Sequence, residues 1–322
     1  MPKLCHSDLD QLYDATHLCC PGYHTLSYGA VTYLVDLFRK AFRAIFQRHQ
    51  HDTILHDMAV EECTILDDAI STVAGSRHID MTDYRDPQAR TLQRLRTNLV
   101  TFVAFKNYHR SQDMIRALTD EHGKIRSWAA FQREVISLGE EYNVHWLQAE
   151  YNTVIAAAQS AAQWDDYIRD AHIFPYLIYK TQHDDKVRAS HQLLHDVCKL
   201  ITDTFWDTYY PPNGWRCRCY VLQAKTDQGY KKEPDAYPDD KSIPPVFRHN
   251  PAKSGKVWNK KHPYFIGISN VIKAKIMRTR NAIIHNQAFF DNLHDIDIHY
   301  TNYLQDSFER EFNHLSSSQS FS

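Results

Sequence analysis

Cys217 and Cys219 are the residues whose types and spacing most readily suggest chemistry in this sequence. Thiolates and imidazoles are preferred zinc ligands, so these cysteines with His191 or His195 form one candidate metal site. Structural zinc sites usually use Cys-x-x-Cys, whereas Cys-x-Cys in a strand places both sulfurs on one face without a turn around the metal. A disulfide is disfavoured, since the Cα atoms of such a pair lie about 6.5 Å apart, near the limit of disulfide geometry. We predict that both thiols pack in the core, and we expect no metal or other cofactor.

A second group of possible metal ligands lies near the start of the chain: Cys5, His6, His17, Cys19, Cys20 and His24. These donors would suffice for a four-coordinate site, but their spacing matches no zinc pattern. The chain has 20 histidines, so clusters of them arise by chance. We predict that this group holds incidental donors.

Asp185, Arg188 and His191 recur every third residue in a stretch that reads as a helix. Such spacing places neighbouring members side by side. A histidine beside a carboxylate can act as a general base, so an enzyme is conceivable. We favour a structural role, in which Arg188 bridges Asp185 and a backbone carbonyl while His191 supports the turn that carries Trp206 and Trp215.

Motifs that would support an enzyme are lacking. The sequence has no Walker loop, no Gly-x-Ser-x-Gly and no His-Glu-x-x-His. Glu309-Arg310-Glu311 resembles the paired glutamates of ADP-ribosyl transferases, but it stands in a charged helix without other motifs. A nuclease or an ADP-ribosyl transferase-like toxin that uses Asp185, Arg188 and His191 stays open as the alternative.

Residues 205–221 are expected to position the cysteines. Pro211-Pro212 stiffens the approach, and Asn213-Gly214 readily takes positive φ, so the chain should reverse sharply there. A short strand should follow, with the two thiols on one face and Arg216, Arg218 and Tyr220 on the other. The turn is expected to expose Trp206 and Trp215, which would make good interface anchors.

The patterns D-x-x-V-R-x-x-H and F-W-D-x-x-x-P-P-N-G-W-x-C-R-C together resemble the signature of the phage Mu protein F-like family of head-morphogenesis, or minor head, proteins. The resemblance is strongest over residues 174–221, and related Bacteroides-type prophage sequences look similar over most of residues 25–265. Where relatives usually carry a glycine-containing turn after the histidine, this chain has residues 194–199 without glycine. The signature residues are Asp185, Arg188, His191, Trp206, Pro211, Pro212, Asn213, Gly214, Trp215, Cys217, Arg218 and Cys219.

The resemblance implies a role in assembly of the phage head and requires no reaction. The protein would be a minor capsid component near the portal that binds portal or capsid proteins, and packaged DNA is a further candidate partner. It would occur in the bacterial cytoplasm during assembly and then in the virion. The sequence has no run of 18 or more apolar residues and no signal peptide at its start, so we expect no membrane contact. Seven cysteines, an odd number, are typical of a reduced chain.

The fold class predicted is α+β, with a mainly helical N-terminal region and a small mixed domain around the signature. Apolar residues at helical spacing predict three helices. They are Val31, Leu34, Phe38, Phe42 and Ile45; Leu92, Leu95, Leu99, Phe102 and Phe105; and Leu147, Tyr151, Val154, Ala158 and Ala161. The apolar run 176–179 predicts a strand. We expect a helical region at 1–172, the Mu F-like domain at 173–265, a helical extension at 266–315 and a disordered tail at 316–322.

The net charge of −2 gives no overall nucleic-acid signature. One segment stands out, because residues 248–280 carry nine Lys or Arg and no Asp or Glu. It is either a phosphate-binding surface or a solvated face that pairs with the acidic segment after it. The candidate nucleic-acid contacts are Lys256, Lys260, Lys261, Lys273, Lys275, Arg278 and Arg280.

Overall fold

The computed structural model describes residues 28–47, 52–140, 142 and 146–284. Long helices make up most of it: α2 (Tyr28–Phe46), α3 (Asp52–Ser76), α4 (Pro87–Arg116), α5 (Trp128–Glu140) and α6 (Trp146–Asp170). Shorter elements follow: β1 (Tyr176–Lys180), α7 (Ala189–Gln192), β2 (Cys198–Leu200), α8 (Phe205–Tyr209), β3 (Tyr220–Ala224), η2 (Pro245–Phe247), α9 (Pro251–Ser254), η3 (Pro263–Phe265) and α10 (Asn270–Ile284). The α+β prediction is confirmed.

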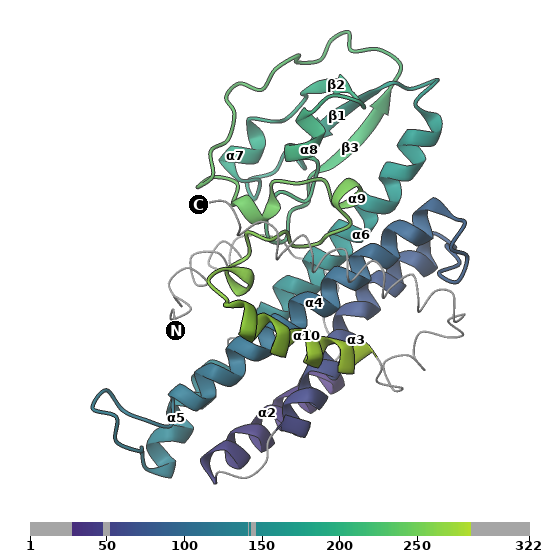
Figure 1. Cartoon of the computed structure of the whole chain (residues 1–322). Coiled ribbons are helices and arrows are strands. Elements are labelled where there is room, and N and C mark those ends of the chain that lie inside the picture. Colours follow the sequence, from purple (N-terminus) through teal and green to yellow (C-terminus); the bar gives the residue numbers. More distant parts are fainter. Residues whose placement is uncertain (1–27, 48–51, 141, 143–145, 285–322) are drawn as a thin grey trace.

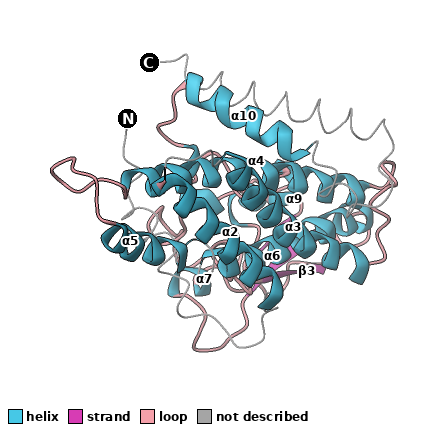
Figure 2. Ribbon diagram, turned by 90° about the horizontal axis from the view of Figure 1, so that it is seen from below, coloured by secondary structure: helices cyan, strands magenta, loops and turns pink. Residues whose placement is uncertain are grey.

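The three predicted amphipathic helices form as α2, α4 and α6, and nearly all of their apolar positions are buried. Asp86 caps α4, because its side chain accepts a hydrogen bond from the backbone N–H of Gln88 at 2.8 Å, and Pro87 starts the helix without needing a donor. The sheet lies at one end of the long helices (Figure 1). Helix α10 runs along the outside of α4 (Figure 2) and packs against it.

The sheet has three antiparallel strands in the order β2-β1-β3. Side chains alternate between its faces, so Leu177, Tyr179 and Val221 point together into the core, where each is at most 3% exposed. The strand predicted at 176–179 is therefore confirmed as β1.

One hydrophobic core runs from α2 through the long helices to the sheet and on to α10. An aromatic cluster joins α4 to the turn before β3: the ring of Phe102 stacks on Trp258 with centroids 3.8 Å apart, and the Trp258 ring lies 6.2 Å from that of Trp215. The division into regions at 172, 265 and 315 stays a prediction, and residues 285–322 lie outside the described part of the chain.

Candidate functional site

The stretch expected to form a helix over residues 185–191 is mostly a turn. Helix α7 begins only at Ala189, after Arg188, whose backbone is extended (φ −60°, ψ 140°). Arg188 donates from Nη2 to the carbonyl of Trp215 at 2.8 Å, and of the two contacts predicted for it this is the one to a backbone carbonyl. Arg218 forms two hydrogen bonds, each 2.7 Å, with the carboxylate of Asp184, which is the first residue of the D-x-x-V-R-x-x-H pattern. The arginine–carboxylate pair between these two segments therefore uses Asp184, and Asp185 is exposed.

The sharp turn after the prolines is present, but its geometry differs from the expectation. The residue with positive φ is Arg216 (φ 52°), whereas Asn213 and Gly214 do not have positive φ. Asn213 is fully buried and accepts a hydrogen bond from the hydroxyl of Tyr179 at 2.9 Å. Gly214 lies against the Arg188 guanidinium, since a Cβ there would be 3.4 Å from its Nη1, which is ordinary van der Waals contact.

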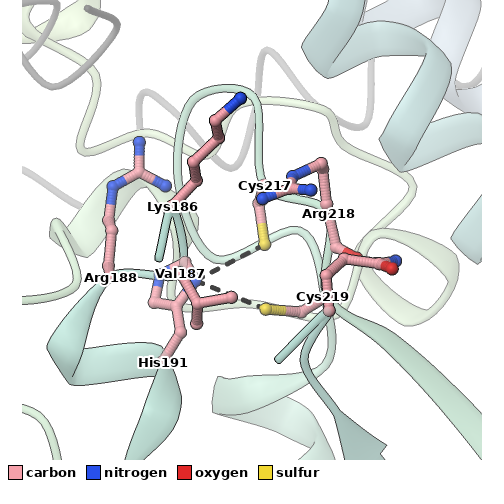
Figure 3. A pocket seen from close by; sticks show the side chains of 8 residues that line it. Lys186, Val187, Arg188, His191, Cys217, Arg218 and Cys219 are labelled. Carbon is pink, nitrogen blue, oxygen red and sulfur yellow. Dashed lines mark hydrogen bonds between the residues drawn. The ribbon is translucent and has the colours of Figure 1, made fainter. Parts of the chain in front are cut away.

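Cys217 and Cys219 lie between this turn and strand β3, which begins only at Tyr220. The strand expected to include these two residues therefore begins only after them, whereas both thiols lie on one side of the chain, as expected. Both sulfurs lie near Nδ1 of His191: Cys217 Sγ at 3.7 Å and Cys219 Sγ at 3.5 Å (Figure 3). The donor atoms of the three residues lie within 4.8 Å of one another.

The cluster is almost closed to solvent. His191 is 2% exposed and Cys217 5%, and both thiols are free. Hydrogen bonding from Cys219, reinforced by the His191 ring, holds the pKa of the Cys217 thiol well below its usual range although burial opposes this. The pKa of Cys219 is raised by the hydrogen bond with Cys217 and by burial.

His195, the other histidine considered as a ligand, serves the backbone instead. Its Nδ1 accepts a hydrogen bond from the N–H of Thr181 at 3.0 Å, just after β1 ends. His191, in turn, has the two sulfurs as the polar neighbours of Nδ1, and its Nε2 has no hydrogen-bond partner among the described residues. Among the described residues, His191 is therefore not paired with a carboxylate, as general base catalysis would require.

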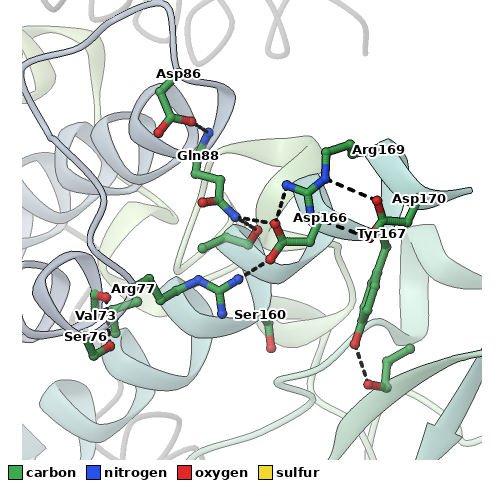
Figure 4. Close-up of polar contacts among 12 residues, drawn as sticks. Val73, Ser76, Arg77, Asp86, Gln88, Ser160, Asp166, Tyr167, Arg169 and Asp170 are labelled. Atoms are coloured by element: carbon green, nitrogen blue, oxygen red, sulfur yellow. Dashed lines mark hydrogen bonds and ion pairs between the residues drawn. The ribbon is translucent and has the colours of Figure 1, made fainter.

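Strand β3, which follows the cysteines, is fastened to the end of α6. The Tyr167 hydroxyl donates to the carbonyl of Val221 (Figure 4), and the Gln223 side chain donates to the carbonyls of Tyr167 at 2.9 Å and Phe174 at 2.8 Å. One residue before Tyr167, Asp166 accepts from Gln88 and Arg77 of the neighbouring helical region. The position of the cluster is therefore fixed relative to the long helices.

Trp206 and Trp215 are buried, at 0% and 1% exposed, so the expectation of an exposed aromatic turn is wrong. The Trp206 indole donates from Nε1 to the carbonyl of Leu200 at 3.0 Å. Both rings stabilise the core and leave partner contacts to other side chains.

The seven candidate nucleic-acid contacts do not form one surface. Lys273 and Arg280 are buried, at 7% and 2% exposed, so they are not available to phosphate. The three at residues 256, 260 and 261 border an open cavity of about 730 Å³ together with Arg94 and Arg248. Lys275 and Arg278 border a separate cavity of about 540 Å³.

Some predicted residues lie outside the described part of the chain. They are the N-terminal donors Cys5, His6, His17, Cys19, Cys20 and His24, and the Glu309-Arg310-Glu311 segment.

In the ranges that the structure covers, no helix is both long enough and apolar enough to cross a bilayer.

The candidate site lies within a segment that matches a known protein family. Residues 107–222 match the family described as "Phage Mu protein F like protein". This segment of the chain is similar to the Mu F-like family. It begins within α4 and ends within β3, so it contains every residue of the His191, Cys217 and Cys219 cluster.

Two curated relatives resemble a shorter stretch. The "Putative capsid assembly protein F" of Escherichia phage Mu is 38% identical over 71 residues, which is 22% of this chain and 16% of that protein. The "Mu-like prophage FluMu F protein" of Haemophilus influenzae is 39% identical over 64 residues, which is 20% of this chain and 16% of that protein. The similarity thus spans about a sixth of each relative, and no solved structure matches.

Proposed function

We propose that this protein is a minor component of a phage head, encoded by a Bacteroides-type prophage, that acts in capsid assembly by binding portal and capsid proteins. The observation that carries the proposal is the Mu F-like segment at 107–222, together with the printed name of the relative from phage Mu. Such a component is present in few copies near the portal, first in the bacterial cytoplasm and then in the virion.

The outer face of the sheet is the surface that we assign to the partner. Strand register places Leu200, Tyr220 and Leu222 on the face opposite the core, and they are 45%, 39% and 43% exposed. Apolar side chains grouped on one exposed face are typical of protein-binding surfaces. This face takes over the role that the sequence suggested for Trp206 and Trp215.

The cavity bordered by Lys256, Lys260 and Lys261 is the second proposed contact. Arg94 and Arg248 add further positive charge at its border, although Arg248 pairs with Asp240 at 2.7 Å. Clustered cations of this kind attract the phosphates of nucleic acid without reading its sequence. Packaged DNA is therefore the proposed ligand of this cavity.

Co-expression with the portal protein encoded beside this gene tests the proposal. The tagged chain should co-purify with that portal protein. Leu222→Lys should weaken the association, because it places a charge on the apolar face, whereas Ile125→Lys should not, although Ile125 is 54% exposed. If the wild-type chain fails to associate with portal or capsid protein and its expression instead arrests growth unless His191 is replaced by Ala, an enzymatic toxin would be favoured over an assembly role.

A further inference from the structure

We propose that His191, Cys217 and Cys219 bind one Zn²⁺ ion in a structural site, with a water molecule as the fourth ligand. Imidazole nitrogen and thiolate sulfur form a soft donor set that favours Zn²⁺ over Mg²⁺ or Ca²⁺. The site is independent of the capsid proposal, since it depends on side-chain geometry inside the chain.

Distances within the cluster fit tetrahedral coordination. With zinc–sulfur bonds of about 2.3 Å and zinc–nitrogen bonds of about 2.0 Å, tetrahedral angles place nitrogen and sulfur about 3.5 Å apart. The two distances from His191 Nδ1 are 3.7 Å to Cys217 and 3.5 Å to Cys219. Little movement of these side chains would therefore be needed to accept the ion.

Hydrogen bonding alone does not explain this convergence equally well. A ring nitrogen carries either one proton or one lone pair, so Nδ1 can pair fully with only one of the two sulfurs. A metal ion at the centre of the three groups satisfies all of them at once. The two thiols release their protons on binding, and the resulting pair of thiolates balances the charge of Zn²⁺.

A small cavity provides the fourth position. It has a volume of about 10 Å³, is bordered by all three donor residues, and has room for about one water molecule. Lys186, Arg188 and Arg218 also border it (Figure 3), and their positive charge favours thiolates over thiols. A space of this volume has no room for an organic substrate, so the ion would have a structural role.

Zinc bound here would join two segments that are distant in sequence. His191 is on α7, and the cysteines directly precede β3. The ion would hold the loop after Trp215 against α7 and so stabilise the edge of the aromatic core. Because binding requires the folded arrangement of all three ligands, its free energy adds to the stability of this region.

Metal analysis of the full-length chain, purified under reducing conditions, tests the site. We expect close to one equivalent of zinc per chain in the wild type. Cys217→Ser and Cys219→Ser should each lose it, whereas Cys198→Ser, a matched change of another buried free cysteine, should retain it. A chelator should lower the thermal unfolding midpoint of the wild type and leave that of Cys217→Ser unchanged.

Substitution with Co²⁺ keeps the test valid even where the serine variants fail to fold. The wild-type chain loaded with Co²⁺ should show the visible bands of tetrahedral cobalt and a thiolate-to-cobalt charge-transfer band. A triple Cys5→Ser, Cys19→Ser and Cys20→Ser variant should retain the same spectrum, which separates this site from the N-terminal donors.

Three outcomes would overturn the proposal. In the first, the folded wild type supplied with Zn²⁺ or Co²⁺ binds neither ion stoichiometrically. In the second, the zinc content is unchanged in both serine variants. In the third outcome, the reduced preparation has an intact mass lower by two hydrogens, with a disulfide mapped between Cys217 and Cys219.

Discussion

Lys106→Met removes the cation at the centre of a buried ion network that joins three helices. Lys106 on α4 contacts Glu62 of α3 at 2.5 Å and Glu150 of α6 at 2.6 Å, and Arg110 contacts Glu62 at 3.0 Å. All four side chains are at most 1% exposed. Their charges balance, because two cations face two carboxylates. The substitution leaves one uncompensated negative charge in the core.

Removing one partner from a buried ion pair costs about 3–5 kcal/mol, out of a total stability of about 5–15 kcal/mol. At about 2–4 °C per kcal/mol for a chain of this size class, the unfolding midpoint should fall by about 6–20 °C. Lys40→Met is the matched control, because Lys40 is an exposed helical lysine. It should change stability by less than about 0.5 kcal/mol.

The pH dependence provides a sharper test. Burial alone would raise the pKa of Glu62, but Lys106 and Arg110 outweigh it, so this pKa is lowered in the folded wild type. A lowered carboxyl pKa stabilises the fold above the unfolded value of about 4.3, and that stability is lost as pH falls through the folded pKa. Without Lys106, less positive charge opposes the effect of burial, so the pKa of Glu62 in the folded state rises. Protonation of Glu62 at lower pH then removes the buried charge.

The destabilisation caused by Lys106→Met should therefore be smaller at pH 5 than at pH 8. Urea unfolding followed by circular dichroism measures it at both values. Replacing Glu62 and Glu150 by Gln in the same variant should recover part of the loss, because the buried charge is then removed. A loss below about 1 kcal/mol at pH 8, or an equal loss at both pH values, would refute this reasoning.

Three further predictions concern other parts of the chain. Asn98→Ala should cost about 3 kcal/mol in chemical unfolding, because the amide makes three hydrogen bonds with the buried backbone of Trp258 and the residue before it. Burial lowers the pKa of His262 well below 6.5, so the contribution of the neutral imidazole to folding stability is complete above about pH 6.5 and falls as pH decreases. His262→Phe should therefore reduce the slope of stability against pH by up to about 1.4 kcal/mol per pH unit. An unchanged slope would contradict this. Lys260→Ala with Lys261→Ala should lower the salt dependence of DNA binding by about two units of log–log slope, measured by fluorescence anisotropy, whereas an unchanged slope would remove both lysines from the DNA contact.

The long helices were predictable from sequence because each buries a continuous apolar stripe that repeats at the helical period. Leu95, Leu99 and Phe102 illustrate this, since all three are 0% exposed. The buried charges on the same helices gave no comparable signal. Lys106 follows the stripe on α4, but its partners lie on α3 and α6, and pairing between helices depends on tertiary packing that a single sequence does not display.

The candidate site was predictable in its residues but only partly in its geometry. His191, Cys217 and Cys219 were recognised as possible ligands, yet a strand was expected to include both cysteines, and β3 begins only at Tyr220. The turn before Cys217 uses positive φ at Arg216, a conformation that no sequence rule assigns to arginine. Turn rules favoured Asn213 and Gly214 for that role, and burial of Asn213 under Tyr179 overrides them.

Three hydrogen-bonded pairs join the two separated groups of signature residues, and two of these pairs also use neighbouring residues, Asp184 and Tyr179. Arg188 binds the carbonyl of Trp215, Arg218 binds Asp184, and Tyr179 binds Asn213. Each bond crosses from the β1–α7 segment to the turn before β3, so the turn is held at three points around the His191 cluster. Loss of any one bond leaves two others in place, whereas a ligand at the centre of the cluster depends on all three. Binding at the cluster should consequently be more sensitive to these substitutions than overall folding is.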